Sequence, residues 1–78
     1  MTYEEFKQKF DEEILPKKDS NLRDGQQLMI YLASVWMLEY SRISLGEYNK
    51  SNIDCFYNDR RMENTFQHLE ENWSQYPN

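Results

Sequence analysis

One segment in the middle of the chain is apolar on almost every side. From Gln26 to Tyr40 the sequence reads QQLMIYLASVWMLEY, and as a helix it leaves almost no polar face. Its 15 residues are too few to span a bilayer, which takes about 20. A helix of this kind in a small protein needs neighbours on several sides. We therefore expect a central helix over residues 25–40, with the rest of the chain packed around it.

The whole chain is short enough that we expect it to form only one domain. A chain of 78 residues cannot close two separate cores. Hydrophobic residues make up 38% of the sequence and aromatic residues 15%, which is more than disordered chains carry. Two glycines and one cysteine exclude a collagen and a disulfide scaffold. We expect a single domain over residues 1–78.

The first flanking segment begins with a capping-box pattern, Thr2 followed three residues later by Glu5. Pro16 favours a helix end near Leu15, because the residue before a proline avoids helical angles. The pattern predicts a helix over residues 3–15. Its apolar residues recur at the spacings of one helix face, at Tyr3, Phe6, Phe10 and Ile14.

The last part of the chain begins with a turn pattern and ends in a second apolar stripe. In DCFYND two aspartates and an asparagine bracket an aromatic pair, which predicts a tight or short helical turn near residues 54–58. Asn58 or Asp59 is then placed to cap a helix over residues 59–73. Apolar residues follow at spacings of four, three and four, at Met62, Phe66, Leu69 and Trp73.

These segments together predict an all-α fold. We expect a small bundle of three main helices with a short helical turn before the last. The first and last helices would each cover one side of the central helix. No alternating apolar and polar run of useful length occurs, so β-structure is not expected.

The charge balance narrows the range of partners. The net charge is −5 and the pI is near 4.7, so the field of the protein repels phosphate backbones and anionic membrane surfaces. Direct nucleic-acid binding and membrane association are therefore not expected. The start, MTYEEFKQKF, lacks the basic and apolar regions of a secretory signal, and a lone Cys55 suits a reducing compartment. We expect a cytoplasmic protein.

The sequence contains few residue patterns that are typical of catalytic sites. His68 has no serine or cysteine at a spacing that forms a nucleophile and base pair, and we expect it to be solvated or half-buried. Asp54 would raise the pKa of the neighbouring Cys55, which favours a small buried residue over a reactive thiolate. Asp54, Asn58 and Asp59 lack the glycine and the ligand number of a calcium loop, so we expect them to cap. We predict a non-enzymatic protein with no cofactor and no metal site.

Aromatic residues give the main signal for a protein partner. Tyrosine and tryptophan anchor interfaces, and this chain has more of them than three short helices can enclose. The alternative is that a core poor in branched aliphatic residues uses rings to fill its volume. Both interpretations stay open for the candidate interface aromatics, which are Tyr3, Trp36, Tyr40, Tyr48, Tyr57 and Trp73.

Acidic side chains give a second signal. They cluster on the first predicted helix, around Glu12, and on the last, around Glu70. Two solvated faces that keep the protein soluble are one interpretation. The other is that the two helices lie side by side and form a joint negative surface, which competes with nucleic acid for a basic groove on another protein.

Two short motifs carry a resemblance to a protein family. The matching residues are Gly25, Gln26, Leu28 and Leu32 in RDGQQLMIYL, then Asp54, Phe56, Tyr57 and Asp59, with Trp73 at the end of the last helix. In these motifs the chain resembles a group of short proteins encoded by bacteriophages and prophages. The resemblance covers most of the chain after residue 22. It implies a phage-encoded accessory protein with a helical fold, and it assigns no catalytic residue.

The motif residues also have structural roles that follow from their chemistry. Gly25, at the start of the central helix, lets a loop approach the backbone closely. Gln26 can bond a free backbone group there. Phe56 and Tyr57 are expected to fold the aromatic turn onto the central helix.

These observations favour a non-enzymatic accessory protein, phage or prophage encoded, that binds a host or phage protein. An inhibitor of a host or defence protein is one specific form. The alternative is a structural or self-assembling protein with no foreign partner. In a competing monomer, the aromatic turn covers the side of the central helix that its neighbours leave open. A homodimer would cover the same patch, formed by Met29, Trp36, Met37 and Tyr40.

Overall fold

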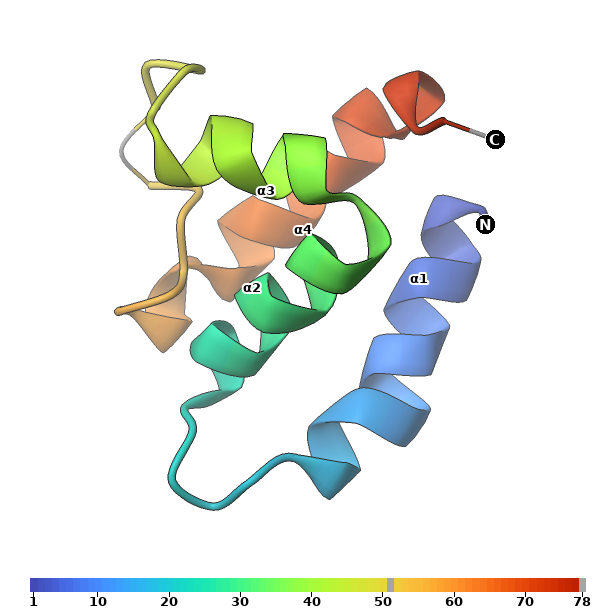
Figure 1. Cartoon of the computed structure of the whole chain (residues 1–78), viewed down its shortest axis with the longest axis vertical. Helices are drawn as coiled ribbons and strands as arrows, with labels where there is room; N and C mark the ends of the chain where they lie inside the picture. Colours follow the sequence, from blue (N-terminus) through green and yellow to red (C-terminus); the bar gives the residue numbers. More distant parts are fainter. Residues whose placement is uncertain (51, 78) are drawn as a thin grey trace.

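Helices and turns make up the described fold. The computed structural model describes residues 1–50 and 52–77, and within them it contains no β-strand. The all-α prediction is therefore confirmed. The α-helices of this part of the chain, labelled in Figure 1, are α1 (Tyr3–Lys9), α2 (Asp24–Val35), α3 (Met37–Ser44) and α4 (Met62–Asn72).

α1 starts at the predicted capping box and its helical path continues further than predicted. The Glu5 amide donates to Thr2 Oγ1 at 3.1 Å, and the Thr2 amide donates to Glu5 Oε1 at 2.8 Å. Beyond α1 the path runs on as a π-helical turn, Phe10–Ile14, and a 3₁₀ turn, Leu15–Lys17. It passes Pro16 instead of ending one residue before it. Pro16 stands in the first residues of the 3₁₀ turn, a position that tolerates proline because the missing amide hydrogen has no partner there.

The central helix is broken in the middle, which corrects the predicted helix over residues 25–40. Trp36 has backbone angles of φ −148° and ψ 76°, so the helix divides into α2 and α3. A straight helix from Asp24 to Ser44 would be about 31 Å long at the usual rise per residue. The fold extends over 30 Å along its longest axis. Because of the break, α3 stays packed over the other helices instead of extending away from them, as Figure 1 shows.

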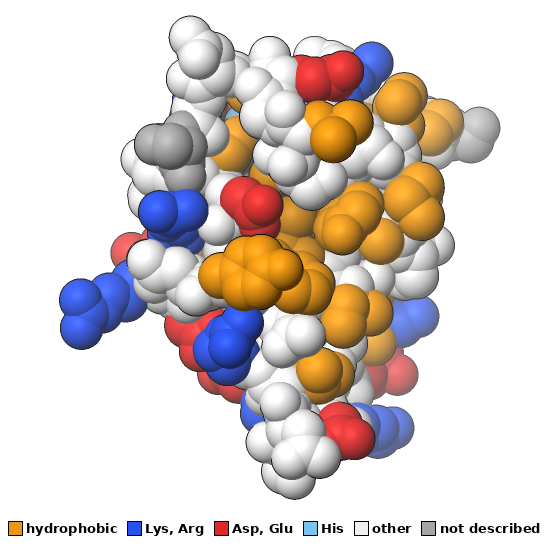
Figure 2. All heavy atoms as spheres, turned by 60° about the vertical axis from the view of Figure 1, so that its left-hand side comes forward, with side chains coloured by type: hydrophobic (Ala, Val, Ile, Leu, Met, Phe, Trp, Pro, Cys, Tyr) orange, Lys and Arg blue, Asp and Glu red, His pale blue; other side chains and the backbone are white. Residues whose placement is uncertain are grey.

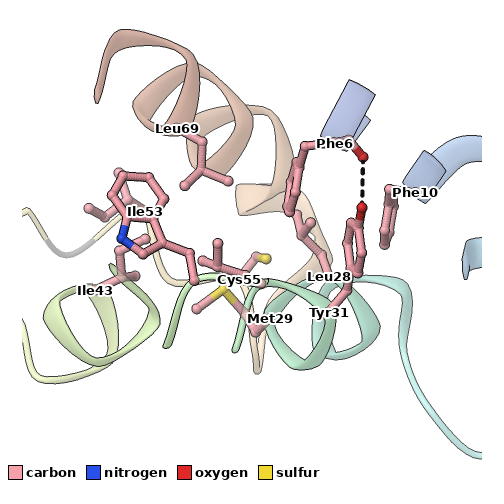
Figure 3. Close-up of a cluster of buried hydrophobic side chains, with 11 residues drawn as sticks. Phe6, Phe10, Leu28, Met29, Tyr31, Ile43, Ile53, Cys55 and Leu69 are labelled. Carbon is pink, nitrogen blue, oxygen red and sulfur yellow. Dashed lines mark hydrogen bonds between the residues drawn. The ribbon is translucent and has the colours of Figure 1, made fainter. Parts of the chain in front are cut away.

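The core lies around α2 and is shown in Figure 3. The Phe6 ring stacks on Tyr31 with centroids 4.6 Å apart, and the Tyr31 hydroxyl donates to the Phe6 carbonyl at 3.3 Å. Other members come from α3, from α4 and from the connection between them. The buried hydrophobic residues are Phe6, Phe10, Leu28, Met29, Tyr31, Leu32, Trp36, Ile43, Ile53, Cys55 and Leu69.

Trp36 is enclosed by the C-terminal segment. Its ring meets the rings of Trp73 and Tyr76 edge to face, with both centroids 5.4 Å away. Trp73 opens the 3₁₀ turn Trp73–Gln75, which follows α4. Trp36 is 3% exposed and Met29 is completely buried, so the dimer patch predicted from the sequence is wrong for these two residues. The residues that cover Trp36 come from the segment at the end of α4. The sequence suggested instead that the aromatic turn would cover this side of the central helix.

The turn before α4 is a tight turn and not a helical one. The Asn58 amide donates to the Cys55 carbonyl at 3.2 Å, which closes a turn of four residues. A 3₁₀ turn over Asp59–Arg61 then leads into α4. The helix predicted over residues 59–73 is thus present, with 3₁₀ turns at both of its ends.

Candidate protein-binding site

The aromatic turn before α4 is held in shape by its own side chains. Asp54 Oδ1 accepts a hydrogen bond from the Phe56 amide at 3.0 Å. Asn58 Oδ1 accepts one from the Arg60 amide, also at 3.0 Å. Asp54 therefore caps the turn and Asn58 caps the helical segment that follows, as the sequence predicts.

The same turn is fixed against the start of α2. A Cβ atom on Gly25 would lie 2.3 Å from the Cys55 carbonyl oxygen, so this position accepts no side chain. The predicted close approach at Gly25 is confirmed. The Gly25 amide donates to Asp59 Oδ1 at 2.9 Å, and the Cys55 thiol donates to the Gly25 carbonyl at 3.3 Å. Asp59 thus satisfies a free amide at the helix start, a role for which the sequence suggested Gln26.

Tyr57 projects from the tip of this turn. It is 81% exposed, more than any other exposed large hydrophobic residue in the described part of the chain. The Arg23 guanidinium donates to the Phe56 carbonyl at 3.0 Å and lies 5.9 Å from the centre of the Tyr57 ring. The Phe56 and Tyr57 rings meet edge to face with centroids 4.8 Å apart. Tyrosine and arginine are among the residues that most often dominate the binding energy of interfaces.

A hollow of about 200 Å³ lies between the turn and α3. Tyr40 and Ser44 line it from α3, and Tyr57 borders it from the turn. Arg23 and Ser44 were not predicted, because neither residue type nor spacing distinguishes them in the sequence. The hollow and the exposed ring together form the candidate site, named the Tyr57 site below, which comprises Arg23, Tyr40, Ser44, Asp54, Phe56 and Tyr57.

The other predicted interface aromatics make contacts inside the fold. Tyr3 meets Trp73 edge to face at 5.9 Å, and Trp73 Nε1 donates to the Met1 carbonyl at 2.8 Å. Trp36 is buried, and Tyr48 is half-buried with its hydroxyl bonded to a buried carboxylate. For these four aromatics the structure favours the interpretation in which rings fill the core.

α1 and α4 lie side by side, but they do not bring Glu12 and Glu70 together. Glu70 borders a hollow of about 460 Å³ between the two helices, whereas Glu12 lines a separate one. Lys7 Nζ lies 4.6 Å from the centre of the Phe66 ring and 2.6 Å from Asp11 Oδ2. The Lys7 ammonium group therefore occupies part of the hollow between the helices. It interrupts the joint negative surface that one interpretation of the sequence predicted.

A buried polar cluster links α3 to α4. Glu39 is completely buried and His68 is 2% exposed, so the expectation of a solvated or half-buried His68 is wrong. Glu39 Oε2 lies 2.8 Å from His68 Nε2, and the Tyr48 hydroxyl lies 2.7 Å from both Glu39 carboxylate oxygens. Burial and the bond to Glu39 raise the pKa of the Tyr48 hydroxyl. The signal in the sequence was Glu39 itself, a lone carboxylate in an apolar segment.

The geometry of this cluster favours a structural role. Asn72 Nδ2 lies 3.3 Å from His68 Nδ1, so both ring nitrogens have partners inside the fold. The side chain of His68 is 2% exposed, so little of its ring is accessible to a bound molecule. Cys55 is also inside the core, where burial raises the pKa of its thiol, and the prediction of a small buried residue is confirmed.

Comparisons with known proteins assign no family. No protein-family model, curated protein or solved structure matches the chain. Within residues 1–50 and 52–77, no helix combines the length and the hydropathy that a membrane span needs. Over the same residues, no three histidine, cysteine, aspartate or glutamate side chains gather as ligands for a metal ion.

Proposed function

We propose that this chain is a protein-binding accessory protein without enzymatic activity, and that its partner docks on the Tyr57 site. The observation that supports this most is the 81% exposure of Tyr57 on a turn that is bonded from two directions. A side chain on a rigid turn loses little further freedom on binding, so more of its contact energy remains as affinity.

The partner that fits this site is a folded protein with an apolar pocket the size of one aromatic ring. That pocket would take the Tyr57 ring. Carboxylates at its rim would pair with Arg23, next to the ring. Because the chain as a whole carries a charge of −5, this basic side chain would also help to fix the orientation of the partner.

The resemblance to phage and prophage proteins supports a phage or prophage origin for this protein-binding protein. In this proposal the protein is phage or prophage encoded, acts in the cytoplasm of the host cell and inhibits a host or defence protein. An inhibitor of this kind needs no active site of its own, because it works by occupying a surface of its target.

Capture from bacterial lysate with matched variants tests the proposal. We expect the wild type and a Glu12→Gln, Glu70→Gln double variant to retain the same stoichiometric partner. Tyr57→Ser should weaken binding of that purified partner by about tenfold or more, with unchanged helicity by circular dichroism. Equal binding by Tyr57→Ser would contradict the proposal, and so would a loss of binding confined to the acidic double variant.

Self-assembly without a foreign partner is the second candidate function. It is favoured by a surface of α2 and α3 that exposes hydrophobic side chains and carries no free charge. In that case the wild type would capture no foreign protein and would sediment well above 9.6 kDa.

A further inference from the structure

The outer side of α2 and α3 exposes large hydrophobic residues. Four of them are between 42% and 76% exposed, namely Ile30, Met37, Leu38 and Leu45. Figure 2 shows hydrophobic side chains gathered from the centre of the view toward its right-hand side, while charged side chains lie beside the central hydrophobic group and mainly to the left and below. The four residues and two serines between them are named the uncharged face: Ile30, Ser34, Met37, Leu38, Ser41 and Leu45.

The uncharged face carries no free charge. Between Gly25 and Gly46 the sequence has two charged residues, Glu39 and Arg42. Glu39 is completely buried on the opposite side of α3. Arg42 lies 3.8 Å from Glu39 Oε1 and 3.9 Å from Glu47 Oε2, so its charge is balanced within the chain. In a sequence of which 29% is charged, this surface is suited to a neutral interface.

We propose that the uncharged face is a homodimer interface, in which α3 packs antiparallel on α3 of a second copy. Two copies that each carry a charge of −5 repel one another wherever carboxylates face carboxylates. The uncharged face avoids this repulsion, and a two-fold axis pairs a surface with itself. A second copy therefore fits the uncharged face better than a strongly charged partner does. The charges of such a partner would meet no opposite charges on this face.

The two-fold axis would pass next to Ser41. With about 100° between successive residues of a helix, the outward side of α3 is centred on Ser41. Leu38 lies about one turn before it and Leu45 about one turn after it. A small side chain at the crossing point lets two helices approach closely. In the antiparallel pair, Leu38 of each copy would pack against Leu45 of the other.

A hollow beside the uncharged face adds complementarity to this arrangement. It measures about 400 Å³, and its lining includes Met37, Leu38 and the charge-balanced Arg42 from α3 and Pro77 from the C-terminal segment. The end of one α3 would lie over the start of the other, so Leu45 of the second copy would enter this hollow. A standard interface buries roughly 800 Å² on each partner, which is about a sixth of the 5053 Å² surface of this molecule.

Sedimentation equilibrium over a range of micromolar concentrations tests the dimer. We expect the mass of the wild type to rise toward twice 9.6 kDa. Leu38→Glu would bring carboxylates into an apolar contact and raise the dimer dissociation constant by about tenfold or more. Gln8→Glu adds the same charge to the exposed side of α1 and should leave the dissociation constant unchanged. Circular dichroism checks that both variants keep their helices.

A disulfide across the axis gives an independent measurement. A cysteine in Ser41→Cys would meet its own copy and crosslink under mild oxidation, because a disulfide needs Cα atoms within about 7 Å. Gln8→Cys is the control, and we expect it to remain uncrosslinked under the same conditions. The native Cys55 is buried and does not compete.

Two outcomes would overturn the dimer. One is a wild type that stays at 9.6 kDa at every concentration, and the other is a Leu38→Glu variant that associates as the wild type does. Neither outcome bears on the Tyr57 site, since loss of the foreign partner in Tyr57→Ser is measured separately. If the dimer fails and that loss is observed, the homodimer is wrong and the proposed function stands.

Discussion

Gly25 has no room for a side chain, and the position of the aromatic turn depends on it. We expect Gly25→Ala to lower the free energy of unfolding by about 3 kcal/mol, because its Cβ would lie 2.3 Å from the Cys55 carbonyl oxygen. Gly46→Ala is the control. A Cβ there has no neighbour within 4 Å, but φ is +74°, so we expect about 1 kcal/mol of backbone strain. Equal losses in urea denaturation would contradict this description of Gly25.

Tyr48 bonds the buried carboxylate of Glu39 from the connection after α3. Tyr48→Phe keeps the ring against His68, 4.3 Å away between centroids, and removes the hydroxyl. We expect the free energy of unfolding to fall by about 2 kcal/mol, because a buried carboxylate loses a hydrogen bond. Tyr57→Phe removes an exposed hydroxyl and should stay within about 0.5 kcal/mol of the wild type. If thermal denaturation finds the two variants equally stable, the bond to Glu39 contributes nothing measurable.

The residue contacts that could be predicted from the sequence are local ones. The capping box joins Thr2 to Glu5, and the turn cap of Asp54 lies two residues from its donor. The cluster of Glu39 and His68 could not be predicted in this way, because the two residues are 29 positions apart. Their contact depends on how α3 is placed against α4, and no periodicity within one helix contains that information.

The start of α1 should respond to pH through its capping box. Hydrogen bonds from Thr2, first from its backbone amide, lower the pKa of the Glu5 carboxyl group. A lowered folded-state pKa adds stability above the unfolded pKa, and this stability is lost as the pH falls through the folded value. We therefore expect the wild type to lose more stability than Glu5→Gln between about pH 5 and pH 3. Urea denaturation at both pH values measures this, and identical losses would contradict it.

The break between α2 and α3 could not be predicted from its own segment. Residues 26–40 contain no glycine and no proline that would end a helix. The cause lies elsewhere in the chain, because Trp36 packs edge to face against the stacked rings of Trp73 and Tyr76. Tertiary packing overrides local helix propensity at such a position. By contrast, the apolar stripe of α4 lies within a single segment of the sequence. Its helix was therefore predicted close to its observed bounds.

The complete fold presents the Tyr57 site and the uncharged face on one molecule. The excess of aromatic residues left two interpretations open, exposed rings or a core filled by rings, and which ring stays exposed depends on cover from distant segments. Tyr57 remains exposed, whereas Trp36 is enclosed. A homodimer would carry two Tyr57 sites, and a partner that engages both at once would bind more tightly than either site allows alone.

Docking at Tyr57 is the proposal on which the function depends. The most direct test replaces Tyr57 with a photo-crosslinking amino acid in bacterial cells that express the protein, and replaces the exposed Glu12 in the same way as a control. We expect a crosslink to one foreign protein from the Tyr57 position and no crosslink to that protein from the Glu12 position. A foreign protein crosslinked from the Glu12 position, with none from the Tyr57 position, would contradict the proposal.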